Sequence, residues 1–80
     1  MKNENTVFSE LWAVVRDYYA PYMTAPEAAR QAGKYMAGNG HEVTEMGKRF
    51  LMIDDELFEI KKNRGWVHFD VIQHGLREYR

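Results

Sequence analysis

The residues of this chain that could perform chemistry are few and widely separated. The 80 residues include three histidines (His41, His68 and His74), a single serine (Ser9) and no cysteine. The histidine spacings do not match HxxxH or HExxH, which place two histidines on one helical face around a metal ion. No P-loop, GxSxG nucleophile elbow or dinucleotide-binding glycine pattern occurs. We therefore expect no metal site, no cofactor and no enzymatic activity.

The composition is that of a small domain rich in apolar residues. Hydrophobic residues make up 45% of the chain, and 11 basic residues face 12 acidic ones, for a net charge of −1. A dedicated nucleic-acid binder usually carries a basic surplus, because phosphate contacts dominate its affinity. No segment approaches the roughly 18 apolar residues of a membrane span, and the N-terminus lacks a signal-peptide pattern. We expect one cytoplasmic domain held together by apolar packing without disulfides.

Two helices are predicted in the first half of the chain. Apolar residues recur at three- and four-residue spacing over residues 5–20, which is typical of one broad helix face, and Pro21 ends this helix. A second helix is predicted over residues 24–38. Its start is marked by Thr24 and Glu27, which fit a capping box, with Pro26 in the first turn. Small residues on one side of it favour close packing against the first helix, so the pair is predicted to form a helical hairpin.

After Gly40 the pattern changes to alternation, which predicts an antiparallel sheet over residues 41–72. Three strands are expected at residues 49–53, 57–62 and 66–72, with a fourth at residues 41–46. The turns are expected at residues 54–56, around residues 63–65, and at residues 47–48. Residues 73–80 are predicted to form a short helix or a tail. The fold class is therefore α+β, with an N-terminal helical hairpin packed on a three- or four-stranded antiparallel β-meander.

The expected turn lengths divide the side chains of the sheet between two faces. A three-residue first loop would place Ile53 opposite Leu57, and an even-length second loop would continue the alternation. The predicted core face holds Phe50, Met52, Phe58, Ile60, Val67, Phe69 and Val71. The predicted outer face holds Leu51, Ile53, Leu57, Glu59, Lys61, Trp66, His68 and Asp70. Four of these eight outer residues are large and apolar, so the outer face is unusually apolar for a surface exposed to water.

An apolar outer face with a charged rim favours a contact site. We predict that a partner binds there, and that Leu51, Leu57, Glu59, Lys61, Trp66 and His68 take part. Two bland readings remain open: the chain's own termini could cover this face, or a homodimer could form on it. Glu59 and His68 are expected to face each other across neighbouring strands.

The two predicted turns of the hairpin differ in charge. Residues 54–56 carry three carboxylates, without the spaced ligands and internal glycine of a calcium loop. The other turn carries three cations, Lys61, Lys62 and Arg64, which could contact phosphates or an acidic protein surface. We expect both turns to be solvated.

A short segment resembles a helix-turn-helix. In Thr24-x-x-Glu27-Ala28-Ala29-x-x-x-Gly33, an alanine precedes a potential turn glycine by four residues, and the resemblance covers about ten residues. It implies that the following sheet could be the wing of a winged or excisionase-like DNA-binding regulator. The chain departs from this pattern in the would-be recognition helix, KYMAGNGHEV, which holds two glycines and one lysine.

These observations favour a small non-enzymatic protein that binds a macromolecular partner, most simply a protein or protein complex, and regulates or inhibits it. Small motif-free single domains of this kind occur as accessory proteins of phages and mobile elements, including inhibitors of host defence complexes such as CRISPR effectors. A winged or helix-turn-helix-like DNA-binding regulator is the first alternative. A homo-oligomeric structural or assembly subunit is the second.

Overall fold

The computed structural model describes residues 6–62 and 67–76 of the chain. Two helices, α1 (Thr6–Arg16) and α2 (Ala25–Gly38), flank a short 3-10 turn, η1 (Ala20–Tyr22). Four strands follow: β1 (Val43–Gly47), β2 (Phe50–Ile53), β3 (Glu56–Lys62) and β4 (Phe69–Leu76). They form one antiparallel sheet in the order β1-β2-β3-β4. The fold is therefore the predicted α+β arrangement of a helical pair and a four-stranded meander.

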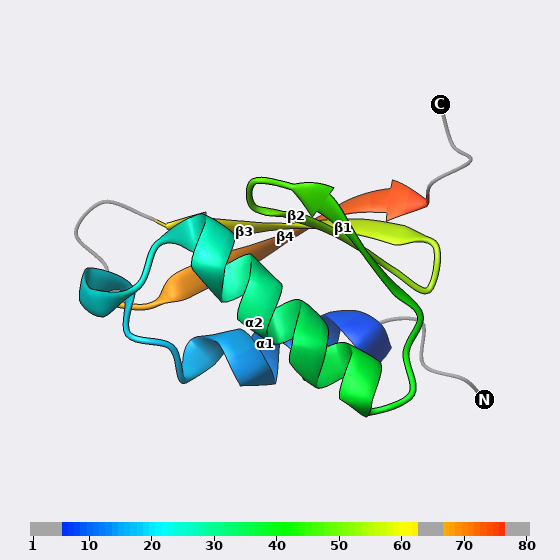
Figure 1. Ribbon diagram of the computed structural model, residues 1–80, viewed down its shortest axis with the longest axis horizontal. Helices are drawn as coiled ribbons and strands as arrows, with labels where there is room; N and C mark the ends of the chain where they lie inside the picture. Colours follow the sequence, from blue (N-terminus) through cyan, green and yellow to red (C-terminus); the bar gives the residue numbers. More distant parts are fainter. Residues whose placement is uncertain (1–5, 63–66, 77–80) are drawn as a thin grey trace.

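The molecule has two layers (Figure 1). Helix α1 contacts β4, and α2 contacts β1, β2 and β3, so that the two helices together cover one face of the sheet. No described element covers the opposite face, which we call the open face. The core lies between the layers.

Local signals place the helix ends. The Thr24 hydroxyl accepts a hydrogen bond from the Glu27 amide at 3.3 Å, so α2 begins at its predicted cap with Pro26 in the first turn. Helix α1 ends at Arg16, earlier than the predicted residue 20, because the chain tightens into η1 ahead of Pro21. The Ala20 amide donates to the Val67 carbonyl at 2.8 Å, which ties this corner to the segment before β4.

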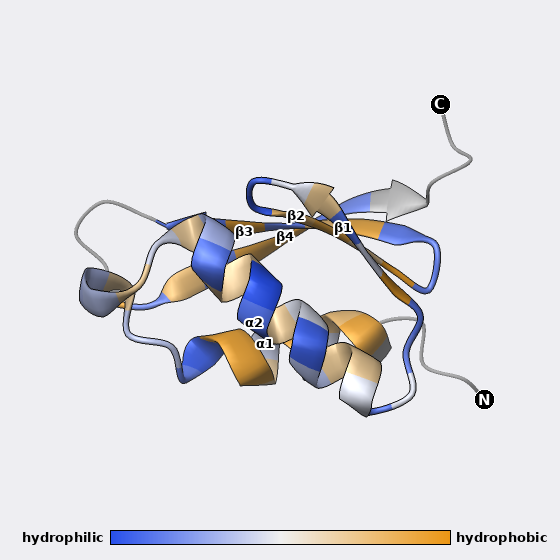
Figure 2. Ribbon diagram, in the orientation of Figure 1, coloured by the Kyte–Doolittle hydropathy of each residue, from blue (hydrophilic) through white to orange (hydrophobic). Residues whose placement is uncertain are grey.

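The core is built from both layers. From the helices, Leu11, Val15, Ala28, Ala32 and Met36 are fully buried, and the sheet adds Leu51, Ile53, Phe58, Ile60 and Phe69. Figure 2 shows apolar segments on β2, β3 and β4 as well as on the helices below them. Small residues on α2 let the helix lie close to the sheet.

The loop between β2 and β3 is one residue shorter than predicted, and this reverses the facing of β2. Ile53 pairs with Glu56 and Leu51 with Phe58, so the connection consists of two residues, Asp54 and Asp55. Both have positive φ, 50° and 70°, as the two-residue hairpin turn with the twist of the strands requires, and aspartate tolerates this region. The predicted three-residue loop was wrong. Leu51 and Ile53 therefore lie in the core, and Phe50 and Met52 lie on the open face.

Strand β4 differs from its prediction at both ends. It starts at Phe69 rather than at residue 66, and Val67, predicted to be in the core, is half exposed. It continues to Leu76, through the start of the segment predicted as a short helix or tail; residues 77–80 lie outside the described residues. Phe58 pairs with Gln73 and Leu57 with Gly75, so His74 is an extra residue, a β-bulge, in β4. The predicted turn at residues 63–65 also lies outside the described residues.

Gly33 of α2 is a point of close approach between the helix and the sheet. A Cβ atom there would lie 3.2 Å from a Leu51 methyl and 3.4 Å from a Val43 methyl, whereas one at Gly38 would meet nothing within 4 Å. Alanine is better than glycine in a helix by up to about 1 kcal/mol. We expect Gly38→Ala to gain part of this in the free energy of unfolding, measured in urea, and Gly33→Ala to gain none because Leu51 must move. An equal gain at both positions would contradict this packing.

Candidate functional site

The open face carries an apolar band. Met52 and Leu57 pair across β2 and β3, and Phe50 and Ile72 flank Glu59 on either side. Met46, half exposed, lines a shallow hollow with Met52 and Thr44. We define the apolar band as Met46, Phe50, Met52, Leu57 and Ile72. All of these except Met46 are partly buried, which shows that they pack against one another while each keeps some surface exposed to solvent.

Three of the predicted site residues lie on the open face and one does not. Leu57, Glu59 and Lys61 alternate with the buried Phe58 and Ile60 along β3, so they face away from the helices as predicted. Leu51 is fully buried beneath α2, so its assignment to the partner surface was wrong. The cause is the two-residue loop, which turns β2 over and exchanges Leu51 and Ile53 for Phe50 and Met52 on this face.

The predicted position of His68 was also wrong. Its ring lies 6.4 Å from the ring of Trp12 in an edge-to-face arrangement, and Trp12 belongs to α1, on the helical side of the sheet. The chain bends at Val67 and His68 before β4 begins, which ends the strand alternation on which the prediction relied. Trp66 lies outside the described residues, so its place on the open face stays a prediction.

Glu59 is the centre of a polar cluster on the open face. Its carboxylate accepts from Arg49 Nε at 2.7 Å and lies 2.9 Å from His74 Nε2. The Arg49 guanidinium lies over the Phe50 ring at 5.3 Å. Glu59 is only 8% exposed, whereas the side chains of Arg49 and His74 are about two-fifths exposed. The hydrogen bonds from His74 and Arg49 hold the pKa of Glu59 below its usual value, because they favour the ionised form.

The partner of Glu59 is thus His74 and not the predicted His68. The bulge in β4 brings His74 onto the open face beside Glu59 and Phe50, 6.0 Å from the Phe50 ring. Simple alternation across β3 and β4 could not have indicated this, because a bulge shifts every later residue by one position.

The cations of the predicted basic turn are only partly described. Lys61 and Lys62 are exposed at the end of β3, and Arg64 lies outside the described residues. Lys61 pairs in register with Asp70 of β4, which places a carboxylate next to the lysine. On the open face Lys61 is joined by Lys48 and Arg49, from the turn between β1 and β2, because the Arg49 carbonyl accepts from the Ile60 amide at 2.9 Å.

A second polar cluster joins three distant segments at the opposite end of the sheet. His41 Nε2 lies 2.8 Å from a Glu10 oxygen of α1, and His41 Nδ1 lies 2.7 Å from an Asp54 oxygen of the β2–β3 turn. The second Asp54 oxygen accepts from the Glu42 amide at 2.9 Å, and Asn39 donates to Glu10 at 3.1 Å. We call Glu10, His41 and Asp54 the latch. Sequence reasoning missed it, since the three residues are far apart and belong to no shared motif.

The latch requires a charged histidine. A carboxylate only accepts hydrogen bonds, so both His41 nitrogens must carry a proton for both contacts to form. The bonds to Asp54 and Glu10 raise the pKa of His41 above its usual 6.5, and the bond to His41 lowers the pKa of Asp54 below 3.8. Both nitrogens are engaged by carboxylates, so His41 is not free to act as a catalytic base.

The latch makes stability depend on pH. A raised pKa in the folded state means that His41 contributes fully below pH about 6.5, and that this contribution is lost as the pH rises through the folded pKa. Asp54 has the opposite sign, and its contribution is lost as the pH falls below its usual range. We expect the wild-type midpoint of thermal unfolding to fall on the alkaline side of pH 6.5, and His41→Gln to remove most of that fall. Identical pH profiles of the two proteins would contradict the latch.

The helix-turn-helix resemblance does not survive in the geometry. Helix α2 runs unbroken from Ala25 to Gly38, so Gly33 makes no turn and no separate recognition helix follows it. Gly33 instead packs against Leu51 of the sheet. Among residues 6–62 and 67–76, no helix is long and apolar enough to cross a membrane.

The two clusters and the apolar band are therefore the features of the described residues with functional potential. Both clusters consist of mutually satisfied acid–base partners, and the band offers contact surface. Comparison of the chain with protein-family models, with curated proteins and with solved structures finds no match.

Proposed function

We propose that this protein is a non-enzymatic binding protein that docks its open face on another protein. Binding there regulates or inhibits the partner in the cytoplasm, in the manner of small accessory proteins of phages and mobile elements. The observation that carries the proposal is the apolar band on a sheet face that no described element covers. Apolar patches with charged rims on small domains tend to be contact sites.

The polar groups of the open face suit docking better than catalysis. Glu59 is almost fully buried and bonded to Arg49 and His74, so it holds these two side chains in place beside Phe50. Aromatic and arginine side chains fixed in this way are the usual anchors of protein interfaces. One end of the Arg49 guanidinium is bound by Glu59, and the exposed part of the side chain remains available to a partner.

The test compares two surface variants in a pull-down from the native host with mass spectrometry. Met52→Asp places a charge in the middle of the apolar band, and Tyr22→Asp places one on the helical side, where Tyr22 is 85% exposed. We expect Met52→Asp to lose the partner that the wild type captures, and Tyr22→Asp to retain it. If Met52→Asp, and a second open-face variant Leu57→Asp, both captured that same partner undiminished, the proposed face would be wrong.

A further inference from the structure

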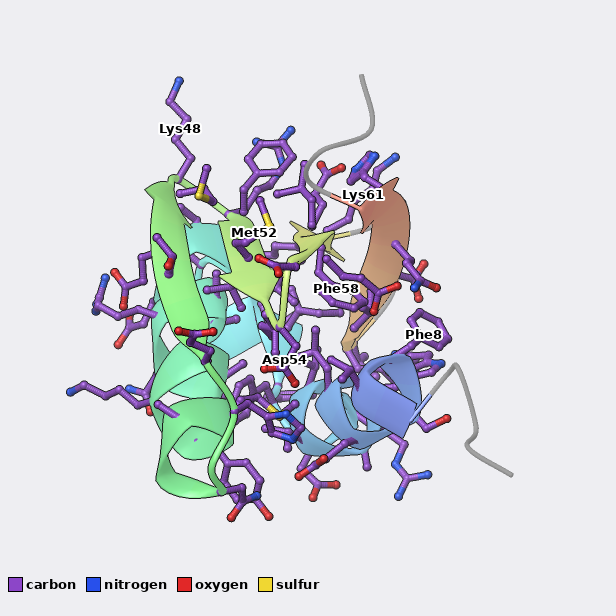
Figure 3. All side chains as sticks on the ribbon, turned by 90° about the vertical axis from the view of Figure 1, so that its right-hand side faces the viewer. Phe8, Lys48, Met52, Asp54, Phe58 and Lys61 are labelled. Carbon is purple, nitrogen blue, oxygen red and sulfur yellow. The ribbon has the colours of Figure 1, made fainter. Side chains whose placement is uncertain are left out.

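The open face is polarised along its strands. Its basic end carries Lys48 and Arg49 from the β1–β2 turn and Lys61 from β3, brought together by the pairing of Arg49 with Ile60. In Figure 3, Lys48 and Lys61 both lie on the side of the sheet away from the helices, with Met52 between them in that view. Arg49 and Lys61 each have a carboxylate beside them, Glu59 and Asp70, so Lys48 is the cation most exposed at this end.

The acidic end of the same face carries Glu42 and Asp55. Both are exposed and line the shallow hollow that also contains Met46 and Met52. The Glu42 backbone is held by two hydrogen bonds of 2.9 Å with Asp54, which fixes this end of β1 beside the β2–β3 turn. The open face thus has an apolar band between a basic end and an acidic end.

A surface with this layout is complementary to itself. A twofold axis lying between two such sheets, perpendicular to their strands, turns the basic end of one copy onto the acidic end of the other. The same rotation places apolar band on apolar band, as in face-to-face sheet packing. We propose that the open face binds a second copy of this chain in this antiparallel, isologous arrangement.

The size of the face sets the strength of the association. Four strands about 4.8 Å apart and five to six residues long at about 3.3 Å each give a face of roughly 300–400 Å². Stable complexes bury about 800 Å² on each partner. The dimer is therefore weak and exchanges with monomer. The inference rests on the proposed function in that both use the open face, and a heterologous partner would compete with the second copy for it.

The test uses two charge reversals at opposite ends of β1. Glu42→Lys removes the acidic end and Lys48→Glu removes the basic end, and both residues are exposed. In the proposed dimer each variant places like charges opposite each other twice, so we expect its self-association to weaken at least about tenfold in sedimentation equilibrium. An equimolar mixture of the two variants restores opposite charges at both contacts, and we expect it to dimerise as the wild type does.

The control is the thermal midpoint of each variant by circular dichroism, which should match the wild type because neither side chain is in the core. Association should also weaken with added salt. A wild type that stays monomeric from about 10 µM to about 1 mM would overturn the proposal, as would a mixture no more associated than its components. Loss of a heterologous partner in Met52→Asp concerns the proposed function alone, since purified protein contains only this chain.

Discussion

Leu51→Asp is expected to leave the protein unfolded, whereas Met52→Asp, one residue along the same strand, is expected to leave it folded. Leu51 is fully buried under α2, and Met52 is on the open face. Truncating a buried leucine costs about 2–5 kcal/mol and an unsatisfied buried polar group costs about 1–3 kcal/mol more. A domain of this size is stable by only about 4–12 kcal/mol.

Circular dichroism and urea unfolding separate the two outcomes. We expect Leu51→Asp to show no cooperative transition, and Met52→Asp to unfold within about 1 kcal/mol of the wild type, as surface changes usually do. Leu51→Met controls for the leucine shape, because a volume-conserving apolar exchange costs less than about 1.5 kcal/mol. The opposite result, a folded Leu51→Asp and an unfolded Met52→Asp, would mean that β2 faces the other way and that the apolar band is misassigned.

Glu59→Ala is expected to lower the free energy of unfolding by about 2–3 kcal/mol at neutral pH. Hydrogen bonds to charged groups contribute about 1.5–3 kcal/mol each, and here Glu59 accepts from Arg49 and bonds to His74. We place the sum at the low end of the range because Arg49 and His74 are partly exposed and can return to water. Glu45→Ala, which removes an exposed carboxylate from the edge strand β1, is the matched control and should change little.

The effect of Glu59 should fade in acid. Its pKa in the folded protein is below its usual 4.5, so its contribution is present above that value and is lost as the pH falls through the folded pKa. We expect the difference between wild type and Glu59→Gln in urea unfolding to be largest above pH about 5 and to shrink towards pH 3. A difference that does not change with pH would show that the Glu59 carboxylate is not held in its ionised form by Arg49 and His74.

The two clusters lie at opposite ends of the sheet and respond to pH on different sides. The latch loses His41 in alkali, and Glu59 loses its charge in acid. Both therefore favour a stability maximum between these limits, and single variants at His41 and Glu59 should each flatten one flank of the profile.

The order of elements was readable from the sequence because it depends on short-range patterns. The cap at Thr24, the stop after Gly38 and the turn at Gly47-Lys48 each involve neighbours within a few residues. The facing of β3 was also predicted correctly, since alternation within one strand needs no partner. These features fixed the α+β class and placed Leu57, Glu59 and Lys61 on one face.

The rest depended on how strands and helices meet. The pattern of β2, four consecutive apolar residues, fits either facing, and only the two-residue turn at Asp54 and Asp55 decides between them. The bulge at His74 and the bend before Phe69 decided which histidine meets Glu59. Neither feature leaves a signal in the alternation itself.

By itself, therefore, the sequence determined the number and type of elements and an apolar surplus larger than one core face can hold. Tertiary structure alone decided which residues form that surplus on the open face, and it alone brought Glu10, His41 and Asp54 together. The physical reason is that local propensity acts over a few residues, whereas register and long-range ion pairs are settled by which arrangement buries Leu51, Ile53 and Phe58 against α1 and α2.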